Sequence, residues 1–291
     1  MAYVYMIRCQ NESLYTGWTP DLEKRLAAHK SGKGAAYTRG FGAECLAYAE
    51  ALPDRSAALR REAAIKRLTK EKKEELAKGF DPKSFVTLSL ARPEDAAAVR
   101  AVTEPYITGS TVSFLYKVPS EKDYRDEIRK TLRTLPFLIA KDAEGNPLGY
   151  ACAHPWRYGA DAYAWDAETT IYLAPQARRK GVGSMLYHTL LACLCLQGFW
   201  NAYAVLADPN PDSEAFHTAF GFVCEGRQKR TGFKNGWQGI SYWLMPLKEE
   251  DSIPESQPHK LEKHTVCSVL EAARMGESWQ NIVKSLQETE K

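Results

Sequence analysis

Two groups of residues, far apart along the chain, have the types and spacing that chemistry requires. Near the N-terminus, two tyrosines, Tyr5 and Tyr15, precede Arg25 and His29. These side chains suit phosphodiester hydrolysis, which needs a base to activate water, a cation over the phosphate and stabilisation of the leaving oxygen. The second group, residues 178–183, combines three basic residues with two glycines. Such a segment suits the binding of a pyrophosphate when it opens a helix.

The elements around the first group place its side chains close together. Residues 3–7 and 13–18 are rich in aromatic and β-branched residues and predict two paired strands. The triplet Thr-Pro-Asp at 19–21 predicts the start of a helix over residues 20–30. The glycines at positions 32, 34, 40 and 42 predict a flexible loop after it.

Charged side chains project from two predicted helices. Arg25 and His29 are four residues apart and therefore share one helix face. On a later helix, which Ser56 is predicted to cap, Glu62 lies at spacing three from apolar residues on both sides, Leu59 and Ile65. A carboxylate in such a stripe needs a partner or a metal ion, because burying an unpaired charge is costly.

Residues 1 to about 78 resemble the GIY-YIG nuclease superfamily, in particular its small single-domain bacterial members. The matching blocks are Tyr3-Val4-Tyr5, Tyr15-Thr16-Gly17, Asp21-Leu22-Glu23-Lys24-Arg25-Leu26, Ser31-Gly32-Lys33-Gly34-Ala35-Ala36-Tyr37-Thr38-Arg39 and Arg61-Glu62-Ala63-Ala64-Ile65-Lys66. The resemblance implies that Tyr5 or Tyr15 is the general base, Arg25 the phosphate contact and His29 an auxiliary group. It also implies that Glu62 holds a single Mg²⁺ or Mn²⁺ and that the substrate is DNA or RNA.

A second interpretation of this domain stays open, because the first triplet is Tyr-Val-Tyr rather than Gly-Ile-Tyr. In it the domain binds nucleic acid without cleaving it, Tyr5 and Tyr15 are aromatic residues of the sheet core, and Glu62 is a paired carboxylate. Residues 1–80 hold 15 Lys and Arg against 10 Asp and Glu, whereas the whole chain has a net charge of +3. This basic excess fits a nucleic-acid partner under both interpretations.

A strand and a helix flank the second group. Residues 169–173 predict a strand, and residues 181–197 predict a helix in which leucine and valine recur every four positions from 182. Gly181 and Gly183 let backbone N–H groups approach phosphate oxygens at the start of this helix, where the helix dipole favours negative charge. The Gly-x-Gly-x-x-Gly spacing of a dinucleotide-binding unit is absent from the sequence here.

Residues 85 to about 248 resemble the GNAT acetyltransferases, and among them the branch that acetylates phosphinothricin and amino acids. The matching blocks are Pro136-Phe137-Leu138-Ile139-Ala140, Gly149-Tyr150-Ala151, Trp165-Asp166-Ala167-Glu168-Thr169-Thr170-Ile171-Tyr172, Pro209-Asn210-Pro211-Asp212-Ser213-Glu214-Ala215-Phe216-His217, Gly221-Phe222 and Phe233-Lys234-Asn235-Gly236-Trp237. The resemblance implies acetyl-CoA as the cofactor, a small amine as the acceptor, and a reaction that needs no metal.

The same resemblance assigns roles to single residues. Glu168 is the expected general base, and His217 takes the place of a tyrosine that protonates or hydrogen-bonds the CoA sulfur. Asn210 is expected to contact the pantetheine arm, to which Ile171 and Leu173 offer main-chain groups. The expected pyrophosphate contacts are the backbone amides of Arg178, Arg179, Lys180, Gly181, Val182, Gly183 and Ser184. The alternatives are that Glu168 is a surface carboxylate of a strand and that His217 packs under a phenylalanine of its own helix.

The acceptor pocket is predicted by composition alone. Tyr116, Trp156, Arg157 and Tyr158 could line it, because an arginine suits a carboxylate or phosphinate. A short helix that ends at residue 220, with Asp212 or Ser213 as its cap, is expected nearby.

The fold class expected from these patterns is α+β, built from α/β layers. We expect a GIY-YIG-like sheet-plus-helices domain over residues 1–79, a linker at 80–84, and a GNAT domain at 85–248 with a central mixed sheet flanked by helices. Residues 249–291 are expected to form a polar linker and a short helical tail that docks onto one of the domains or, alternatively, recognises a partner. The leading function is an N-acetyltransferase fused to a metal-dependent endonuclease.

Composition bounds the class of protein. No apolar run reaches the roughly 18 residues that a membrane span needs, and the first residues lack the pattern of a signal peptide, so we expect a cytoplasmic protein without a membrane partner. The seven cysteines are scattered and lack Cys-x-x-Cys spacing, which favours reduced thiols. The expected partners are a small amine and DNA or RNA, with a homodimer as one alternative assembly. A scaffold with two inactive sites is the remaining interpretation.

Overall fold

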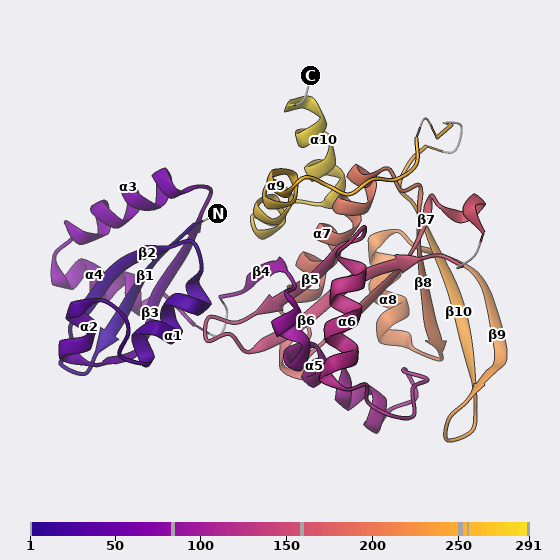
Figure 1. The fold of residues 1–291 in the computed structure, drawn as a ribbon, viewed down its shortest axis with the longest axis horizontal. Helices are drawn as coiled ribbons and strands as arrows, with labels where there is room; N and C mark the ends of the chain where they lie inside the picture. The colour runs from indigo at the N-terminus through magenta and orange to yellow at the C-terminus, as the bar shows by residue number, and fades with distance from the viewer. Residues whose placement is uncertain (1, 83–84, 158–159, 250–252, 255, 290–291) are drawn as a thin grey trace. The chain divides into compact units, whose positions relative to one another are not determined.

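The structure is a computed structural model that describes residues 2–82, 85–157, 160–249, 253–254 and 256–289 (Figure 1). The chain splits into two compact units. Unit 1 comprises Met1–Thr87 and Lys141–Asn146, and unit 2 comprises Leu88–Ala140 and Pro147–Lys291. Residues 83–84 of the predicted linker at 80–84, and residues 250–252 and 255 of the predicted polar linker, lie outside the described residues.

Unit 1 is built on a three-stranded antiparallel sheet in the order β2-β1-β3, with helices on both faces. Its strands are β1 (Ala2–Cys9), β2 (Leu14–Thr19) and β3 (Ala43–Leu52), and its helices are α1 (Leu22–Lys30), α2 (Ala36–Phe41), α3 (Arg55–Lys66) and α4 (Lys70–Lys78). Alternate residues of β1 enter two separate apolar clusters. Tyr5 and its neighbours at spacing two pack with Leu22 and Leu26 of α1, whereas Val4 and Met6 pack toward Ile65 of α3.

Four sequence predictions for unit 1 were wrong in detail. Helix α1 begins at Leu22, two residues later than expected, because Asp21 rather than Thr19 caps it and accepts from the Lys24 N–H over 3.0 Å. Asp54, not Ser56, caps α3 in the same way. Residues expected to form a flexible loop include the helix α2, and Leu59 is 40% exposed, so the apolar stripe around Glu62 is narrower than predicted.

Unit 2 contains a seven-stranded mixed sheet in the order β4-β5-β6-β7-β8-β10-β9. Its strands are β4 (Thr87–Leu90), β5 (Phe137–Lys141), β6 (Pro147–Pro155), β7 (Asp166–Leu173), β8 (Asn201–Asp208), β9 (Val223–Phe233) and β10 (Trp237–Pro246). Its helices are α5 (Ala96–Gly109), α6 (Glu121–Thr131), α7 (Val182–Gln197), α8 (Pro211–Phe220), α9 (Lys263–Arg274) and α10 (Trp279–Thr289). The α+β class expected from the sequence is confirmed.

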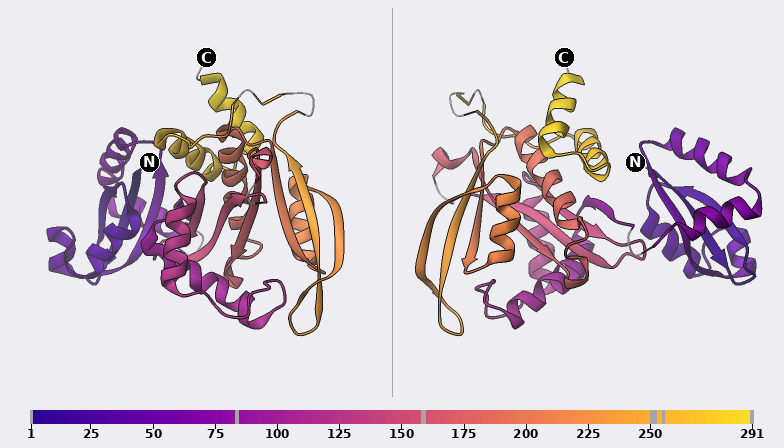
Figure 2. Two further views of the ribbon diagram at one scale, coloured as in Figure 1. Left: turned by 45° about the vertical axis from the view of Figure 1, so that its right-hand side comes forward. Right: turned by 180° about the vertical axis from the view of Figure 1, so that it is seen from behind.

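Helices cover both faces of this sheet (Figures 1 and 2). Tyr150 of β6 hydrogen-bonds Thr103 of α5 and lies opposite Tyr172 of β7 on the same face. Thr169 of β7, three residues before Tyr172, points to the other face and contacts Tyr187 of α7. The middle strands are therefore buried on both sides, which fits their apolar sequences.

Helix α6 and the C-terminal tail add the remaining helices of unit 2. Helix α6 was not predicted from the sequence, although Ser120 and Asp123 form a capping box at its start and its charged face is exposed. The tail forms α9 and α10 on either side of Gly276, and both pack against α7 (Figure 2). The apolar residues of these helices, such as Val269 and Ile282, are fully buried by this packing. Within the described residues, every helix is too short or too polar to span a bilayer.

Candidate functional sites

Four side chains of unit 1 form one continuous chain of hydrogen bonds. The Nε–H of Arg25 on α1 donates to the hydroxyl of Tyr5 on β1 over 2.9 Å, and this hydroxyl lies 2.9 Å from Nε2 of His29. Nδ1 of His29 lies 2.6 Å from the hydroxyl of Thr38 on α2, which donates to the carbonyl of Ala35. Three of the side chains singled out in the sequence are thus brought into direct contact.

The direction of each hydrogen bond follows from the end of the chain. Because Thr38 gives its only hydroxyl proton to a carbonyl, it accepts from His29, whose proton must lie on Nδ1. Nε2 then accepts, so the Tyr5 hydroxyl donates to His29 and accepts from Arg25. Burial raises the pKa of Tyr5 to about 12, while burial and the Arg25 charge lower the pKa of His29 to about 4. Both groups are therefore neutral at neutral pH.

Two glycines make this close packing sterically feasible. Gly17 lies directly across from Tyr5 in the β1–β2 ladder, and a Cβ atom there would lie 2.7 Å from the Tyr5 hydroxyl oxygen. A Cβ atom on Gly34 would lie 2.4 Å from Nδ1 of His29. These glycines serve the close approach of side chain to backbone rather than flexibility.

Tyr15 extends the site with a row of aromatic rings. Its ring centroid lies 5.4 Å from that of His29 and 6.1 Å from that of Tyr37, and Tyr37 lies 4.8 Å from Phe41. Tyr37 and Phe41 are exposed. Strand β2 and helix α2 thus present an aromatic surface beside the hydrogen-bonded chain, and such surfaces can stack on nucleobases.

Glu62 lies on α3 and is mostly covered. Its side chain is 15% exposed and forms an ion pair with Lys66 over 2.9 Å. Its negative charge contributes to the raised pKa of Tyr5, which places it within electrostatic reach of that phenol. A single carboxylate supplemented by waters is a coordination that Mg²⁺ accepts, so Glu62 fits such an ion once Lys66 is displaced.

The strands β7 and β8 of unit 2 separate partway along their length. Within the described strands they pair in parallel at three positions, the last of which joins Glu168 to Tyr203. Strand β7 nevertheless stays paired with β6 as far as Leu173, and β8 stays paired with β10 as far as Asp208. A gap bounded by main-chain groups therefore opens directly after Glu168.

The hydroxyl of Thr169 occupies the first position beyond the paired part. It donates to the carbonyl of Tyr203 over 2.9 Å and lies 2.7 Å from the buried hydroxyl of Tyr187 on α7. The Tyr203 carbonyl thereby receives the hydrogen bond that a continuing ladder would supply. Sequence reasoning missed this pair of residues, although a polar residue on the inner face of a predicted strand was a signal.

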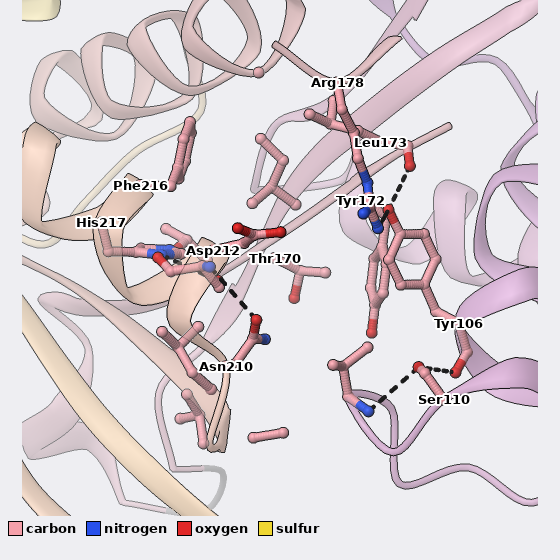
Figure 3. A pocket seen from close by; sticks show the side chains of 18 of the residues that line it. Tyr106, Ser110, Thr170, Tyr172, Leu173, Arg178, Asn210, Asp212, Phe216 and His217 are labelled. Carbon is pink, nitrogen blue, oxygen red and sulfur yellow. Dashed lines mark hydrogen bonds between the residues drawn. The ribbon is translucent and has the colours of Figure 1, made fainter. Parts of the chain in front are cut away.

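The gap forms part of a cavity of about 550 Å³ (Figure 3). Its walls come from β7, β8, the segment before α7, the start of α8 and Tyr106 of α5. The cavity brings together most of the residues predicted for this site: Glu168, Ile171, Leu173, Arg178, Arg179, Gly181, Gly183, Ser184, Asn210 and His217. Two predicted residues, Lys180 and Val182, do not line it, and Val182 is buried in the core.

The segment before α7 has the backbone of an anion-binding turn. Gly181 caps α7 with φ of 78°, in the left-handed region that glycine adopts without strain, and Arg179 also has a positive φ of 58°. The N–H groups in the first turn of α7 have no partner within the helix and face its N-terminal end. The side chain of Arg178 donates to Tyr106 over 2.9 Å, and both residues line the cavity, so the turn itself presents backbone N–H groups.

Glu168 stands at the point where the strands separate. It lies opposite His154 of β6 and beside Tyr203 of β8. Burial raises the pKa of its carboxyl group. Among the described residues no side chain forms an ion pair or hydrogen bond with this carboxylate, which leaves it able to take a proton from a ligand.

His217 lies on α8 with 2% of its surface exposed. Its Nδ1–H donates to the carbonyl of Ser213 over 2.8 Å, and its ring packs edge-on against Tyr187, Phe216 and Phe222. Burial lowers its pKa to about 4. The imidazole is therefore neutral, with a proton on Nδ1 and an accepting Nε2.

Asn210 begins α8 and has a structural task of its own. Its Oδ1 accepts from the N–H of Ser213 over 3.4 Å, which makes it the cap of α8 in place of the predicted Asp212 or Ser213. The side chain also lines the cavity, and its NH₂ group is not used by the cap.

The residues predicted for an acceptor pocket are not brought together as a group. Trp156 stacks on Tyr203 with ring centroids 4.3 Å apart, and Arg157 lies over Trp156. Tyr116 is 71% exposed and hydrogen-bonds the carbonyl of Phe233. Tyr158 lies outside the described residues.

Two family models match the chain. The model of the GIY-YIG catalytic domain matches residues 1–75, and the model of the Acetyltransferase (GNAT) family matches residues 106–222. A UPF0213 protein of Haloquadratum walsbyi is 52% identical over 75 residues, which cover 26% of this chain and 84% of that relative.

The downstream part has its own relatives. The phosphinothricin N-acetyltransferase of Streptomyces viridochromogenes is 34% identical over 159 residues, which cover 54% of this chain and 86% of that protein. A solved structure of a GNAT superfamily phosphinothricin acetyltransferase from Sinorhizobium meliloti, in complex with AcCoA, is 30% identical with a TM-score of 0.56. The match covers 59% of this chain and 95% of that structure. Both resemblances stated from the sequence are confirmed.

Proposed function

The chain belongs to the GNAT N-acetyltransferase family and carries a GIY-YIG domain at its N-terminus, and from this premise we propose how each part acts. Unit 2 transfers the acetyl group of acetyl-CoA to the amine of a small amino acid or of an analogue such as phosphinothricin or methionine sulfone. The observation that carries this proposal is the gap between β7 and β8, which begins at Glu168 and opens into the cavity beside α7.

The residues around the gap fit acetyl-CoA. Main-chain groups of β7, among them those of Ile171 and Leu173, border the gap and would hold the pantetheine arm, although the Leu173 carbonyl already accepts from the Tyr106 hydroxyl. The N–H groups from Arg178 to Ser184 would hold the pyrophosphate, because the left-handed turn and the N-terminus of α7 gather donors and a favourable dipole there. When bound, acetyl-CoA supplies an activated acetyl thioester.

Glu168 is the proposed general base. A carboxylate whose pKa is raised by burial is better matched to deprotonating an ammonium group than one in water. No side chain of the described residues competes for its lone pairs. It would take the proton of the acceptor amine, directly or through a water molecule, and hold it on a carboxylate oxygen.

We assign His217 a supporting role. A proton donor to sulfur would need a hydrogen on Nε2, whereas the proton of this ring is committed on Nδ1 to the Ser213 carbonyl. With a pKa lowered to about 4, the ring does not gain a second proton near neutrality. His217 therefore accepts a hydrogen bond at Nε2 and shapes the wall of the cavity, while the NH₂ group of Asn210 is available to donate to the cofactor.

A panel of amines tests the acetyltransferase proposal. Thiol release from acetyl-CoA should be fastest with amino acids, phosphinothricin or methionine sulfone and slow with polyamines or peptide N-termini. Acetyl-CoA should also raise the thermal midpoint of unit 2 by mass action. The absence of a thermal shift at saturating acetyl-CoA contradicts the cofactor assignment, and a preference for polyamines contradicts the acceptor class.

We further propose that unit 1 is a metal-dependent phosphodiesterase acting on DNA or RNA. Tyr5 already donates to His29 and accepts from Arg25, so Tyr15, half-buried and packed on the His29 ring, is the better candidate for the base. Arg25 would contact the phosphate through its remaining N–H groups. Glu62 would hold Mg²⁺ or Mn²⁺, which would supply charge stabilisation of the leaving oxygen.

The second candidate for unit 1 is a module that binds nucleic acid without cleaving it. The exposed rings of Tyr37 and Phe41 support a binding surface independently of Glu62. Incubation of a supercoiled plasmid with Mg²⁺ distinguishes the candidates. Nicking supports the phosphodiesterase, whereas salt-sensitive binding with an intact plasmid supports the module.

A further inference from the structure

Three side chains of unit 2 that have no role in the proposed reaction converge on one point. Cys152 and His154 lie two residues apart on β6, and Glu127 lies on the adjacent helix α6. The Cys152 Sγ is 3.5 Å from Nε2 of His154, and a carboxylate oxygen of Glu127 is 3.8 Å from the same nitrogen. One ligand atom from each residue lies within 4.8 Å of the other two.

The convergence on a single nitrogen decides between two chemistries. In a nucleophilic triad the thiol meets one ring nitrogen and the carboxylate orients the other. Here both Cys152 and Glu127 face Nε2, so Glu127 cannot orient His154 for nucleophilic catalysis. Burial and the charge of Lys130 lower the pKa of His154, so the ring offers a lone pair rather than a positive charge. A thiol, an imidazole lone pair and a carboxylate around one centre are the ligands of a borderline-soft metal ion.

One of the observed distances has the value of a tetrahedral zinc site. With Zn–S of about 2.3 Å and Zn–N of about 2.0 Å, the sulfur and nitrogen of two ligands lie about 3.5 Å apart, and nitrogen and carboxylate oxygen lie about 3.3 Å apart. The Cys152–His154 distance already has this value. Glu127 must move toward Nε2 by about half an ångström and also toward Sγ, from which its oxygen lies within 4.8 Å. Its side chain is 42% exposed and therefore has room to do so.

We propose that Glu127, Cys152 and His154 form a binding site for Zn²⁺ or a similar divalent ion. The thiol of Cys152 is buried and burial raises its pKa, so the ion must displace its proton as the Zn–S bond forms. His154 and Glu127 bind through Nε2 and a carboxylate oxygen. Because three protein ligands leave the fourth tetrahedral position open, the ion can bind water or an anionic group there.

The site lies beside Glu168, and this position gives it a consequence for acetyl transfer. His154 is directly opposite Glu168 in the β6–β7 ladder, and burial, followed by the charges of Glu127 and Glu168, raises the pKa of the Cys152 thiol. A bound dication stabilises the ionised form of Glu168 and repels an incoming ammonium group. Zn²⁺ therefore inhibits the transferase, a step that rests on the proposed function of Glu168.

Titration of the full chain with Co²⁺ tests the site without using activity. A thiolate–cobalt charge-transfer band should appear with one equivalent of Co²⁺ and be displaced by Zn²⁺. The band should vanish in Cys152→Ser, and Glu127→Gln, a change at a half-buried helix side chain, should weaken Co²⁺ binding at least tenfold. The control Cys224→Ser alters a partly exposed cysteine of the same unit and should leave the band unchanged.

The outcomes separate the two steps of the inference. A band that persists in Cys152→Ser overturns the site, as do an unchanged Co²⁺ affinity in Glu127→Gln and the lack of any band in the wild type. Thioester consumption, followed without a thiol reagent, should be inhibited by Zn²⁺ in the wild type and restored by a chelator. Metal binding without inhibition overturns the second step alone, and a metal-free enzyme that transfers no acetyl group contradicts the proposed function but leaves the metal site standing.

Discussion

The two sites of this chain differ in how completely their side chains already bind one another. In unit 1 the phenol of Tyr5 and the ring of His29 have every polar atom occupied, from Arg25 at one end to Thr38 at the other. In unit 2 the carboxylate of Glu168 has no bonded partner among the described residues and faces a cavity. A site assembled from mutual hydrogen bonds couples its chemistry to the stability of the fold, whereas an open site keeps the two separate.

The largest expected effect tests whether chemistry and fold stability are separate in unit 2. Glu168→Gln keeps the shape of the side chain and removes the base, so kcat should fall about 10²- to 10⁴-fold, the usual contribution of a general base. Thermal protection by acetyl-CoA should stay unchanged, because Glu168 does not hold the cofactor. In the wild type the rate should fall as the pH drops through the raised pKa of Glu168.

A matched carboxylate controls this experiment. Glu225 is an exposed residue of strand β9, and Glu225→Gln should transfer acetyl groups at the wild-type rate. If Glu168→Gln remains within a few-fold of the wild type, Glu168 is a strand carboxylate and the base lies elsewhere.

The corresponding change in unit 1 is Glu62→Gln. Nicking of plasmid DNA should fall about 10²-fold, because loss of a metal ligand removes several kcal/mol of charge stabilisation. Gel assays across Mg²⁺ concentrations measure the effect, and Glu75→Gln on the exposed side of α4 is the control. Equal nicking by Glu62→Gln and wild type would remove Glu62 from the metal site and favour the binding module.

The contrast between the sites also explains which parts could be predicted from the sequence. Strands and most helices follow from local patterns, and Arg25 and His29 were placed on one face by their spacing alone. The contact of Thr38 with His29 depends on α2. The sequence predicted a loop at these residues because of the nearby glycines. The gap in the sheet could not be predicted, since the pairing of β7 with β8 stops at Glu168 for reasons of tertiary structure.

Two residues of unit 2, Asn210 and Glu127, show the same limit of prediction from the sequence. Asn210 was predicted as a cofactor contact and proves to cap α8 as well, because a cap is recognised only once the first turn is located. Glu127 approaches His154 only because α6 packs on β6, and α6 was not predicted. Local signals identify residue types and periodicity, but contacts between distant segments require the packed structure.

The third prediction tests the coupling in unit 1. Tyr5→Phe leaves the Nε–H of Arg25 and Nε2 of His29 without their partner, so unfolding free energy should fall by about 2 to 3 kcal/mol, the cost of unsatisfied buried groups. Urea denaturation measures this change, and acetyl-CoA identifies the transition of unit 2. Tyr15 is half-buried, so Tyr15→Phe should cost less. An equal loss of unfolding free energy in the two variants would contradict the central place of Tyr5 in the chain of hydrogen bonds.

The pH dependence of stability compares one buried histidine from each unit. Both His29 and His217 have a pKa lowered from the ordinary 6.5 to about 4, so the unfolded state binds their protons first. Their contribution is fully present above pH 6.5 and is lost as the pH falls toward 4, by about 2 kcal/mol each at pH 5. Denaturation midpoints at pH 7 and pH 5 measure this loss. His29→Gln and His217→Gln should each flatten the pH dependence of one unit, and an unchanged slope in either variant would contradict the lowered pKa.

The smallest expected effect concerns Asn210, where a helix cap and a cofactor contact can be tested separately. Asn210 caps α8 through Oδ1, while its NH₂ group is available to the cofactor. Asn210→Asp keeps a capping oxygen and removes the NH₂ donors, so stability should be retained while the KM for acetyl-CoA rises. Asn210→Ala loses both functions and should also cost about 1 kcal/mol in unfolding free energy. If Asn210→Asp binds acetyl-CoA as the wild type does, the side chain serves the helix alone, and the open site then depends on its main-chain groups for the pantetheine arm.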